Sequence, residues 1–381
     1  MKHVPVLVTV LLLAGGSQGG AGTPLLAPAD VSPFNVGSAS GQVLLADVNN
    51  DGHLDLLTRH QQARSIRIHL GDGRARFTTT RSTVALNFSP ADMSIGDVNG
   101  DKILDLVVTA GGRDVVDVLL GNGTTGFTRA KGSPFAASKR VYPYNKRSLH
   151  LVDVNADGHL DVVTANRRGQ YAFRVLLGTG RGRFAAGPVL TVEPAHEGYT
   201  LAFGDVDGDR DVDVVTAVSS PDRGRLDVHL GNGRGVFRKA LGSAVSLPPT
   251  YRIEALADMN SDRRPDLVLS HRHAIVSVLL NRGGGRFAHT AGSPFDLPAR
   301  PFSVAMADFN QDDRLDLVGA TVDSVTVLLG TGLAFPRARQ SSFPAGPGAY
   351  GLAIGDLNGD RRPDVVASSF ESNAVTVLLG R

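Results

Sequence analysis

The pattern of hydrophobic and polar positions along this chain predicts many short β-strands and no long helices. Apolar stretches of four to six residues, rich in Val, Leu and Ile, alternate with segments rich in Gly, Asn and Asp. Residues 43–46, 118–121 and 351–354 are examples. Apolar runs of this length between turn residues are typical of strands joined by tight turns.

These stretches recur in a repeating unit. Each unit contains an apolar stretch, the pattern Asp-x-Asn/Asp-x-Asp-x-x-x-Asp, a second apolar stretch, and a third that in several units ends in Leu-Leu-Gly before a Gly-rich turn and a Phe. The pattern begins at Asp47, Asp97, Asp153, Asp205, Asp258, Asp308 and Asp356, at intervals of 48 to 56 residues. Four strands per unit at this spacing indicate a propeller blade. The sequence therefore predicts an all-β fold, a seven-bladed β-propeller of four-stranded blades.

The two ends of the chain complement each other. The last unit stops at Arg381, directly after its Leu-Leu-Gly, and lacks the fourth strand that carries the Phe. Residues 32–34, Ser-Pro-Phe, match residues 133–135 and 293–295, which follow the Phe strand in other units. We therefore expect residues 23–31 to supply the outer strand of the last blade and close the ring, which removes open sheet edges.

The N-terminus has the character of a secretion signal. Lys2 and His3 precede an apolar run over residues 4–14, and small residues follow as far as Gly22. This order is typical of a signal peptide, although a buried strand is the alternative interpretation of the run. We assign residues 1–21 to the signal peptide and residues 22–381 to the propeller. The run is too short for a comfortable membrane span, so a secreted, periplasmic or cell-surface protein is expected.

The acidic residues of the repeat offer a set of oxygen ligands. Calcium takes six to eight hard oxygen ligands, and the pattern supplies them at positions 1, 3, 5 and 9, with a backbone carbonyl expected from position 7. An EF-hand is excluded because its loop needs a Glu at position 12 and flanking helices. The predicted metal ligands are Asp47, Asn49, Asp51, Asp55, Asp97, Asn99, Asp101, Asp105, Asp153, Asn155, Asp157, Asp161, Asp205, Asp207, Asp209, Asp213, Asp258, Asn260, Asp262, Asp266, Asp308, Asn310, Asp312, Asp316, Asp356, Asn358, Asp360 and Asp364.

A strand is expected to begin directly after position 9 of the acidic pattern. With the acidic loop placed between two strands in this way, the unit resembles the FG-GAP/VCBS repeat, known from the seven-bladed head of integrin α chains. The resemblance covers about residues 23–381. It implies that each acidic loop joins the first two strands of a blade and binds one structural Ca²⁺, up to seven in all. Position 6, where the chain turns sharply, is Gly only at Gly52 and Gly158. A side chain at positive φ costs about 1 kcal/mol, so the other five loops are expected to bind more weakly.

Charged and aromatic residues predict a ligand-binding surface on the face of the propeller opposite the acidic loops. The formal net charge is +2, and the loops hold 22 of the 37 acidic residues. Seven bound Ca²⁺ would raise the charge to roughly +16, which favours anionic partners; the alternative is that Arg is simply the solubilising cation of a GC-rich genome. Tyr side chains stack on sugar faces, and Arg side chains pair with carboxylates. The alternative is that the Tyr and Arg side chains on this face only fill the junctions between blades. The predicted ligand-binding residues are Arg140, Tyr142, Tyr144, Arg147, Tyr199, Tyr251, Arg300 and Tyr350.

The sequence contains no catalytic motif. There is no Gly-x-Ser-x-Gly elbow, no His-Glu-x-x-His and no phosphate loop, and Cys is absent. We therefore expect a non-enzymatic, monomeric recognition or adhesion module that binds an extracellular glycan or protein and not nucleic acid. The alternative is a polysaccharide-active enzyme of the lyase or dehydratase type on a propeller scaffold, although the even repeat spacing leaves little room for the insertions that would build its pocket.

Overall fold

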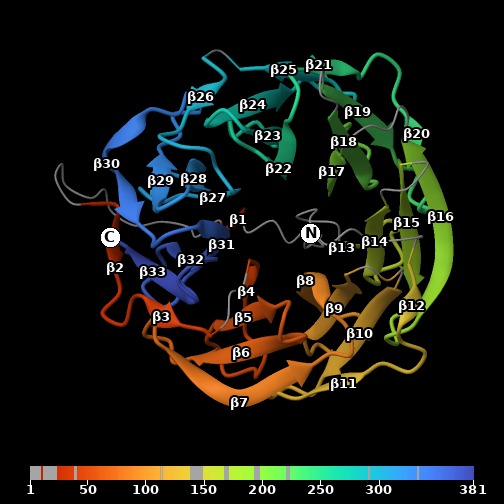
Figure 1. The fold of residues 1–381 in the computed structure, drawn as a ribbon. Coiled ribbons are helices and arrows are strands. Elements are labelled where there is room, and N and C mark those ends of the chain that lie inside the picture. Colours follow the sequence, from red (N-terminus) through yellow and green to blue (C-terminus); the bar gives the residue numbers. More distant parts are fainter. Residues whose placement is uncertain are drawn as a thin grey trace.

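Seven sheets arranged around a central axis form the molecule (Figure 1). The computed structural model describes residues 10–11, 24–37, 41–111, 113, 115–137, 149–166, 171–192, 198–219, 224–290, 292–332 and 334–381. Every regular element within these residues is a β-strand. In the same part of the chain no helix could cross a membrane. The predicted all-β, seven-bladed propeller is confirmed.

Each blade is an antiparallel sheet whose strands follow one another from the axis outward. The first strands lie nearest the axis: β4 (Val43–Ala46), β8 (Pro90–Gly96), β13 (Leu149–Val152), β17 (Gly198–Gly204), β22 (Arg252–Ala257), β27 (Ser303–Ala307) and β31 (Ala349–Gly355). The second strands are β5 (Asp55–His60), β9 (Asp105–Ala110), β14 (Asp161–Asn166), β18 (Asp213–Ser219), β23 (Asp266–His271), β28 (Asp316–Ala320) and β32 (Asp364–Ser369).

The third and outer strands complete the blades. The third strands are β6 (Ser65–Gly71), β10 (Val115–Gly121), β15 (Tyr171–Gly178), β19 (Gly224–Leu230), β24 (Ile275–Asn281), β29 (Ser324–Leu328) and β33 (Ala374–Gly380). The outer strands are β7 (Phe77–Ala85), β11 (Phe127–Arg129), β12 (Phe135–Ala136), β16 (Phe184–Val192), β20 (Arg238–Lys239), β21 (Val245–Leu247), β25 (Phe287–His289), β26 (Phe295–Asp296) and β30 (Arg337–Pro344).

The hydrophobic core is divided into clusters between adjacent blades. Successive residues of a second strand point to opposite faces of the sheet and enter different clusters. Leu56 of β5 packs with Val366 and Val377 of the last blade, whereas Leu57 packs with Met93 and other residues of the second blade. The continuous apolar character of the second strands thus follows from burial on both faces.

The blade that contains the C-terminus takes its outer strands from the N-terminal segment. β2 (Leu26–Pro28) pairs antiparallel with β33, with Leu26 opposite Gly380. β3 (Phe34–Asn35) pairs with the other end of β33. The Ser32 hydroxyl accepts a hydrogen bond from the Val377 N–H (3.0 Å), as the Ser133 hydroxyl does from the Val118 N–H (2.8 Å). The repeated Ser-Pro-Phe motif therefore marks equivalent positions in these two blades.

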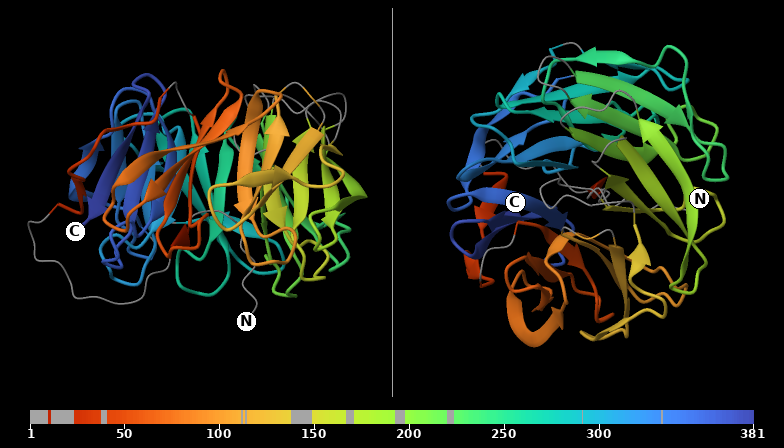
Figure 2. Two further views of the ribbon diagram at one scale, coloured as in Figure 1. Left: turned by 90° about the horizontal axis from the view of Figure 1, so that it is seen from below. Right: turned by 45° about the vertical axis from the view of Figure 1, so that its right-hand side comes forward.

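Most of the predicted signal peptide lies outside the described residues. Its described part is β1 (Val10–Leu11), whose backbone pairs in parallel with Met306 and Ala307 of β27. Seen from the side, the blades form a thick disc with loops on both faces (Figure 2).

Candidate metal sites and the opposite face

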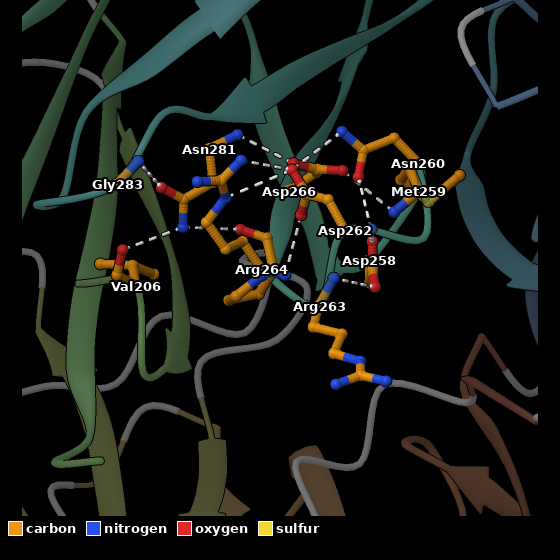
Figure 3. A network of polar contacts seen from close by, with 11 residues as sticks. Val206, Asp258, Met259, Asn260, Asp262, Arg263, Arg264, Asp266, Asn281 and Gly283 are labelled. Atoms are coloured by element: carbon orange, nitrogen blue, oxygen red, sulfur yellow. Dashed lines mark hydrogen bonds and ion pairs between the residues drawn. The ribbon is translucent and has the colours of Figure 1, made fainter. Parts of the chain in front are cut away.

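The seven acidic loops occupy the same place in every blade, between its first and second strands. In the fifth blade the loop runs from Asp258, directly after β22, to Asp266, the first residue of β23 (Figure 3). Because the blades repeat around the ring, these loops share one face, and the turns between second and third strands share the other. The structure thus gathers the predicted metal ligands into seven separate sites.

Backbone N–H groups hold the Asp side chains at positions 1 and 5 of each loop. In the fifth loop, Asp258 Oδ2 accepts a hydrogen bond from the Arg263 N–H (2.7 Å), and Asp262 Oδ1 accepts one from the Arg264 N–H (2.9 Å). The same two bonds, from positions 6 and 7, recur in the other six loops. Each loop therefore closes around its first carboxylate.

This closure places two residues of every loop in the left-handed region. Position 6 has φ between 63° and 85° at Gly52, Lys102, Gly158, Arg210, Arg263, Asp313 and Arg361. Position 4 has φ between 57° and 93° at Asn50, Gly100, Ala156, Gly208, Ser261, Gln311 and Gly359. The sequence indicated the turn at position 6 but missed the one at position 4, where Gly occurs in three of the seven loops. Recurrence of Gly, Asn or Ser at position 4 was the available signal.

The Asp at position 9 of each loop is buried beneath it. Asp266 is 0% exposed, and its carboxylate accepts hydrogen bonds from the N–H groups of Met259 (3.0 Å) and Asn281 (2.8 Å). The equivalent Asp residues of the other loops are also 0% exposed and accept the same pair of bonds. These bonds fix the orientation of each carboxylate and leave lone pairs on both oxygens for a cation.

Burial gives these carboxyl groups unusual acidities. Burial makes the largest contribution to a raised pKa, and the nearby loop carboxylates raise the pKa further, whereas the two hydrogen bonds from N–H groups lower it. The pKa rises to about 6 for Asp105, Asp213 and Asp266, and to about 7 for Asp161, Asp316 and Asp364. The pKa of Asp55 is also raised. Each loop thus holds negative charge that a bound cation would stabilise.

The fourth loop differs from the others in its third position. Carboxylate oxygens of Asp205, Asp207 and Asp209 all lie within 4.8 Å of one another, an arrangement not found elsewhere among the described residues. Burial, followed by repulsion from its two neighbours, raises the pKa of Asp207. In the remaining loops an Asn takes this place, and its Nδ2 donates to the Asp at position 5. The fourth loop therefore concentrates the most charge.

The fifth loop carries a cation of its own. The Arg264 guanidinium lies 2.7 Å from Asp262 Oδ2 and forms an exposed ion pair (Figure 3). Asp262 is a predicted ligand, so a metal ion at this site has to compete with Arg264 for one carboxylate oxygen. Exposed ion pairs are weak because water screens them, so the competition is modest.

The Gly of the Leu-Leu-Gly motif supports the buried Asp. The Gly178 N–H donates to Asp161 Oδ1 (2.7 Å), and a Cβ on Gly178 would lie 2.2 Å from the Leu160 carbonyl oxygen. Gly71, Gly121, Gly231 and Gly330 are similarly close to a carbonyl oxygen. With the third strand this close to the loop, a Cβ on any of these glycines would clash with a carbonyl oxygen, which explains why Gly recurs there; only the fifth blade, among the described blades, has a different residue, Asn281, at the equivalent position.

Hydrogen bonds also connect the acidic loops to neighbouring blades. Asn281 Nδ2 donates to the Val206 carbonyl oxygen (2.9 Å), which belongs to the acidic loop of the preceding blade (Figure 3). Equivalent bonds to loop carbonyls are donated by the backbone N–H groups of Ala75 to Leu357, Gly182 to Val98 and Gly235 to Val154. The conformation of these loops is therefore tied to the junctions between blades.

On the opposite face, the structure brings together two of the predicted ligand-binding residues. Arg300 is exposed, and its Cζ atom lies 5.5 Å from the centre of the Phe302 ring. The Tyr350 ring centre lies 5.7 Å from that of Phe302, with both rings half-buried. These residues come from the starts of the sixth and seventh blades, which are far apart in sequence.

Of the other predicted ligand-binding residues, Tyr251 does not join this cluster. Tyr251 is 5% exposed and packs in the core between the fourth and fifth blades, so its side chain is not available to a ligand. Tyr199 lies within β17. Arg140, Tyr142, Tyr144 and Arg147 lie outside the described residues.

Comparison with known proteins identifies the repeat. A model of the FG-GAP-like repeat matches residues 47–108, 153–216, 205–269, 258–319 and 312–367, which is more than half of the chain. These matches span the acidic loops described above. No protein of curated function matches the sequence significantly.

Solved structures share the fold at low sequence identity. BBS1N in complex with ARL6DN is 14% identical with a TM-score of 0.60, covering 94% of this chain and 98% of that one. An Agrocybe aegerita lectin that recognises non-reducing terminal N-acetylglucosamine is 18% identical with a TM-score of 0.54, covering 88% and 86%. Saccharomyces cerevisiae Sqt1 is 10% identical with a TM-score of 0.55, covering 92% and 100%. At these identities the likeness concerns the propeller fold alone.

Proposed function

Because this chain belongs to the family of proteins with FG-GAP-like repeats, we propose that it is a non-enzymatic recognition module whose propeller is stabilised by calcium. The observation that carries the proposal is the recurrence of a completely buried Asp under each acidic loop. A buried carboxylate beside other carboxylates is costly unless a cation or a proton neutralises it. Seven such sites in one ring favour a bound cation as the common solution.

The donor set fits calcium. Each loop offers carboxylates at positions 1, 5 and 9 and an amide or carboxylate at position 3, all of them hard oxygen ligands. The irregular loop with two left-handed residues suits an ion that accepts variable geometry, whereas Mg²⁺ demands near-ideal octahedral coordination. Bound Ca²⁺ would supply charge neutralisation. The loops would transmit that stability to the blade junctions through bonds such as that from Asn281 to Val206.

The thermal stability of the purified chain in calcium tests this proposal. Addition of about 1 mM CaCl₂ to EDTA-treated protein is expected to raise Tm by several degrees, because a ligand that binds only the folded state stabilises it. The same concentration of MgCl₂ serves as the control and is expected to raise Tm less. Equal Tm values in calcium and in EDTA would exclude structural calcium sites.

We further propose that the module recognises an extracellular glycan or protein after export to the periplasm, the cell surface or the medium. Two structural neighbours support a recognition role, since one is solved with the protein ARL6DN and another is a lectin. The predicted signal peptide over residues 1–21 supports export. N-terminal sequencing of the protein recovered from the producing cell and from its medium tests export, and protein found only inside the cell with Met1 retained would contradict it.

A further inference from the structure

A cationic and aromatic patch lies on the face opposite the acidic loops, where the fifth, sixth and seventh blades meet. We define this patch as Arg252, Arg272, Arg300, Phe302 and Tyr350. Arg252 starts β22, Arg272 follows β23, Arg300 and Phe302 precede β27, and Tyr350 lies at the start of β31. First strands and the turns after second strands meet at this end of the blades, so the propeller topology gathers the patch from segments about 100 residues apart.

The contacts within the patch form a connected surface. Arg252 Nη2 lies 3.4 Å from the carbonyl oxygens of both Pro301 and Phe302, which joins the fifth blade to the sixth. Arg300 Cζ lies 5.5 Å from the centre of the Phe302 ring, and the centre of the Tyr350 ring lies 5.7 Å from the same point. The two rings are inclined by 33° and remain half-exposed. A guanidinium group and two half-exposed aromatic rings therefore lie side by side.

Positive charge in the patch exceeds negative charge. Arg252 lies 3.5 Å from the buried Glu254 carboxylate, which also accepts a hydrogen bond from Ser270. Within the described part of the chain, neither Arg272 nor Arg300 forms an ion pair with a carboxylate. Burial, together with the neighbouring Arg252 and Arg272, lowers the pKa of Arg300. An anionic group would relieve this repulsion and accept hydrogen bonds from guanidinium groups.

The combination of positive charge and half-exposed aromatic rings suits an acidic sugar. Aromatic rings pack against the apolar faces of sugars, and Arg binds carboxylate or sulfate groups in a fixed geometry. We propose that this patch binds anionic sugar residues of an extracellular polysaccharide. The proposal rests on the proposed recognition function and assigns it a site and a ligand class.

Binding of the mature protein to polygalacturonate, in which the charge is carboxylate, and to dextran sulfate tests this assignment; neutral dextran is the uncharged reference. Arg300→Gln and Tyr350→Ala are each expected to weaken binding to the preferred polyanion about tenfold or more, as loss of a charged hydrogen bond or an aromatic contact predicts. Arg238→Gln is the matched control. Arg238 is exposed on the outer strand β20, so this variant removes the same charge far from the patch.

Each outcome of this experiment decides the proposal. A loss specific to Arg300→Gln and Tyr350→Ala supports the patch, and the better ligand identifies carboxylate or sulfate as the recognised group. Equal losses in Arg300→Gln and Arg238→Gln would indicate nonspecific attraction and overturn it. Binding of a poly-glutamate peptide but of neither polysaccharide would also overturn it. Tm measured in calcium and in EDTA on the same samples shows separately whether the calcium proposal stands, because the patch lies on the other face of the ring.

Discussion

Under the proposed calcium binding, acidification is expected to reduce the stability that calcium would add to this propeller. The buried Asp at position 9 of each loop has a pKa raised from the ordinary 3.8, to about 6 in Asp105 and to about 7 in Asp161. A carboxyl group whose pKa is higher in the folded state binds its proton more readily when folded. The metal-free protein therefore gains stability from these groups as the pH falls from neutral towards about 4. Calcium needs the ionised form, so protons compete with it.

The size of the effect follows from the acidities. Between about pH 8 and about pH 5, the ionised fraction of a group with a pKa of about 7 falls roughly a hundredfold, and that of a group with a pKa of about 6 roughly tenfold. At saturating calcium these factors correspond to a loss of about 3 and about 1 kcal/mol of calcium-dependent stability per site. Summed over several sites, this loss is expected to reduce markedly the increase in Tm that calcium would cause.

The assay is thermal unfolding with calcium and with EDTA at a series of pH values. The difference between the two Tm values is the quantity of interest, because histidines such as His69 contribute equally to both measurements. Asp161→Asn is expected to reduce the pH dependence of this difference, whereas Asp72→Asn, an exposed residue outside the loops, leaves it unchanged. A calcium-induced Tm shift of the same size at pH 8 and pH 5 would refute the reasoning.

Three further changes test the fold. Gly178→Ala is expected to lower the free energy of unfolding in urea by about 2–3 kcal/mol, because its Cβ would lie 2.2 Å from the Leu160 carbonyl oxygen. Gly319→Ala is the control, since a Cβ there meets only side-chain atoms at 3.3 Å or beyond. Equal losses in the two variants would contradict the steric argument. Burial lowers the pKa of His69 from 6.5 to about 4. In EDTA, the free energy of unfolding of the wild type is therefore expected to fall by up to about 3 kcal/mol relative to His69→Leu as the pH falls from about 6.5 to about 4. Parallel curves of stability against pH for the two proteins would rule this out. A chain that starts at residue 41 lacks β2 and β3 and leaves β33 as an open edge. Light scattering is therefore expected to detect association of such chains. A monomer with unchanged Tm would show that these strands are dispensable.

The repeat made the fold predictable because it states the same local information seven times. The apolar second strands, the acidic loops and the Ser-Pro-Phe match near the N-terminus all lie where they were expected. The local conformation at position 4 was not predictable, since Ala156 and Gln311 adopt positive φ only because the hydrogen bonds of the loop require it. Repetition thus specified where the loops lie, but the bonding within a loop sets the backbone angles of its individual residues.

The opposite face was less predictable for a related reason. Tyr251 and Tyr350 both occur near the start of a first strand, yet Tyr251 packs into a blade junction and Tyr350 stays half-exposed. Which of two similar aromatic residues fills a junction depends on the volume left by the neighbouring blade, and no local pattern encodes that volume. Likewise, the contact between Arg300 and Phe302 becomes part of a larger cluster only because the seventh blade places Tyr350 beside Phe302.

The pairing of β2 with β33 has a consequence for how the chain folds. Leu26 and Gly380 lie opposite each other in this ladder, and the Arg381 N–H donates to the Leu25 carbonyl oxygen (3.0 Å), although these residues stand far apart in the sequence. This pairing closes a loop that spans most of the sequence, and the entropy of that closure makes such contacts slow to form. A nascent chain can assemble its early blades as they emerge, but the ring cannot close before the final residues have been synthesised. Until then the β2 segment has no partner strand, and a chain truncated within the last blade would never gain one.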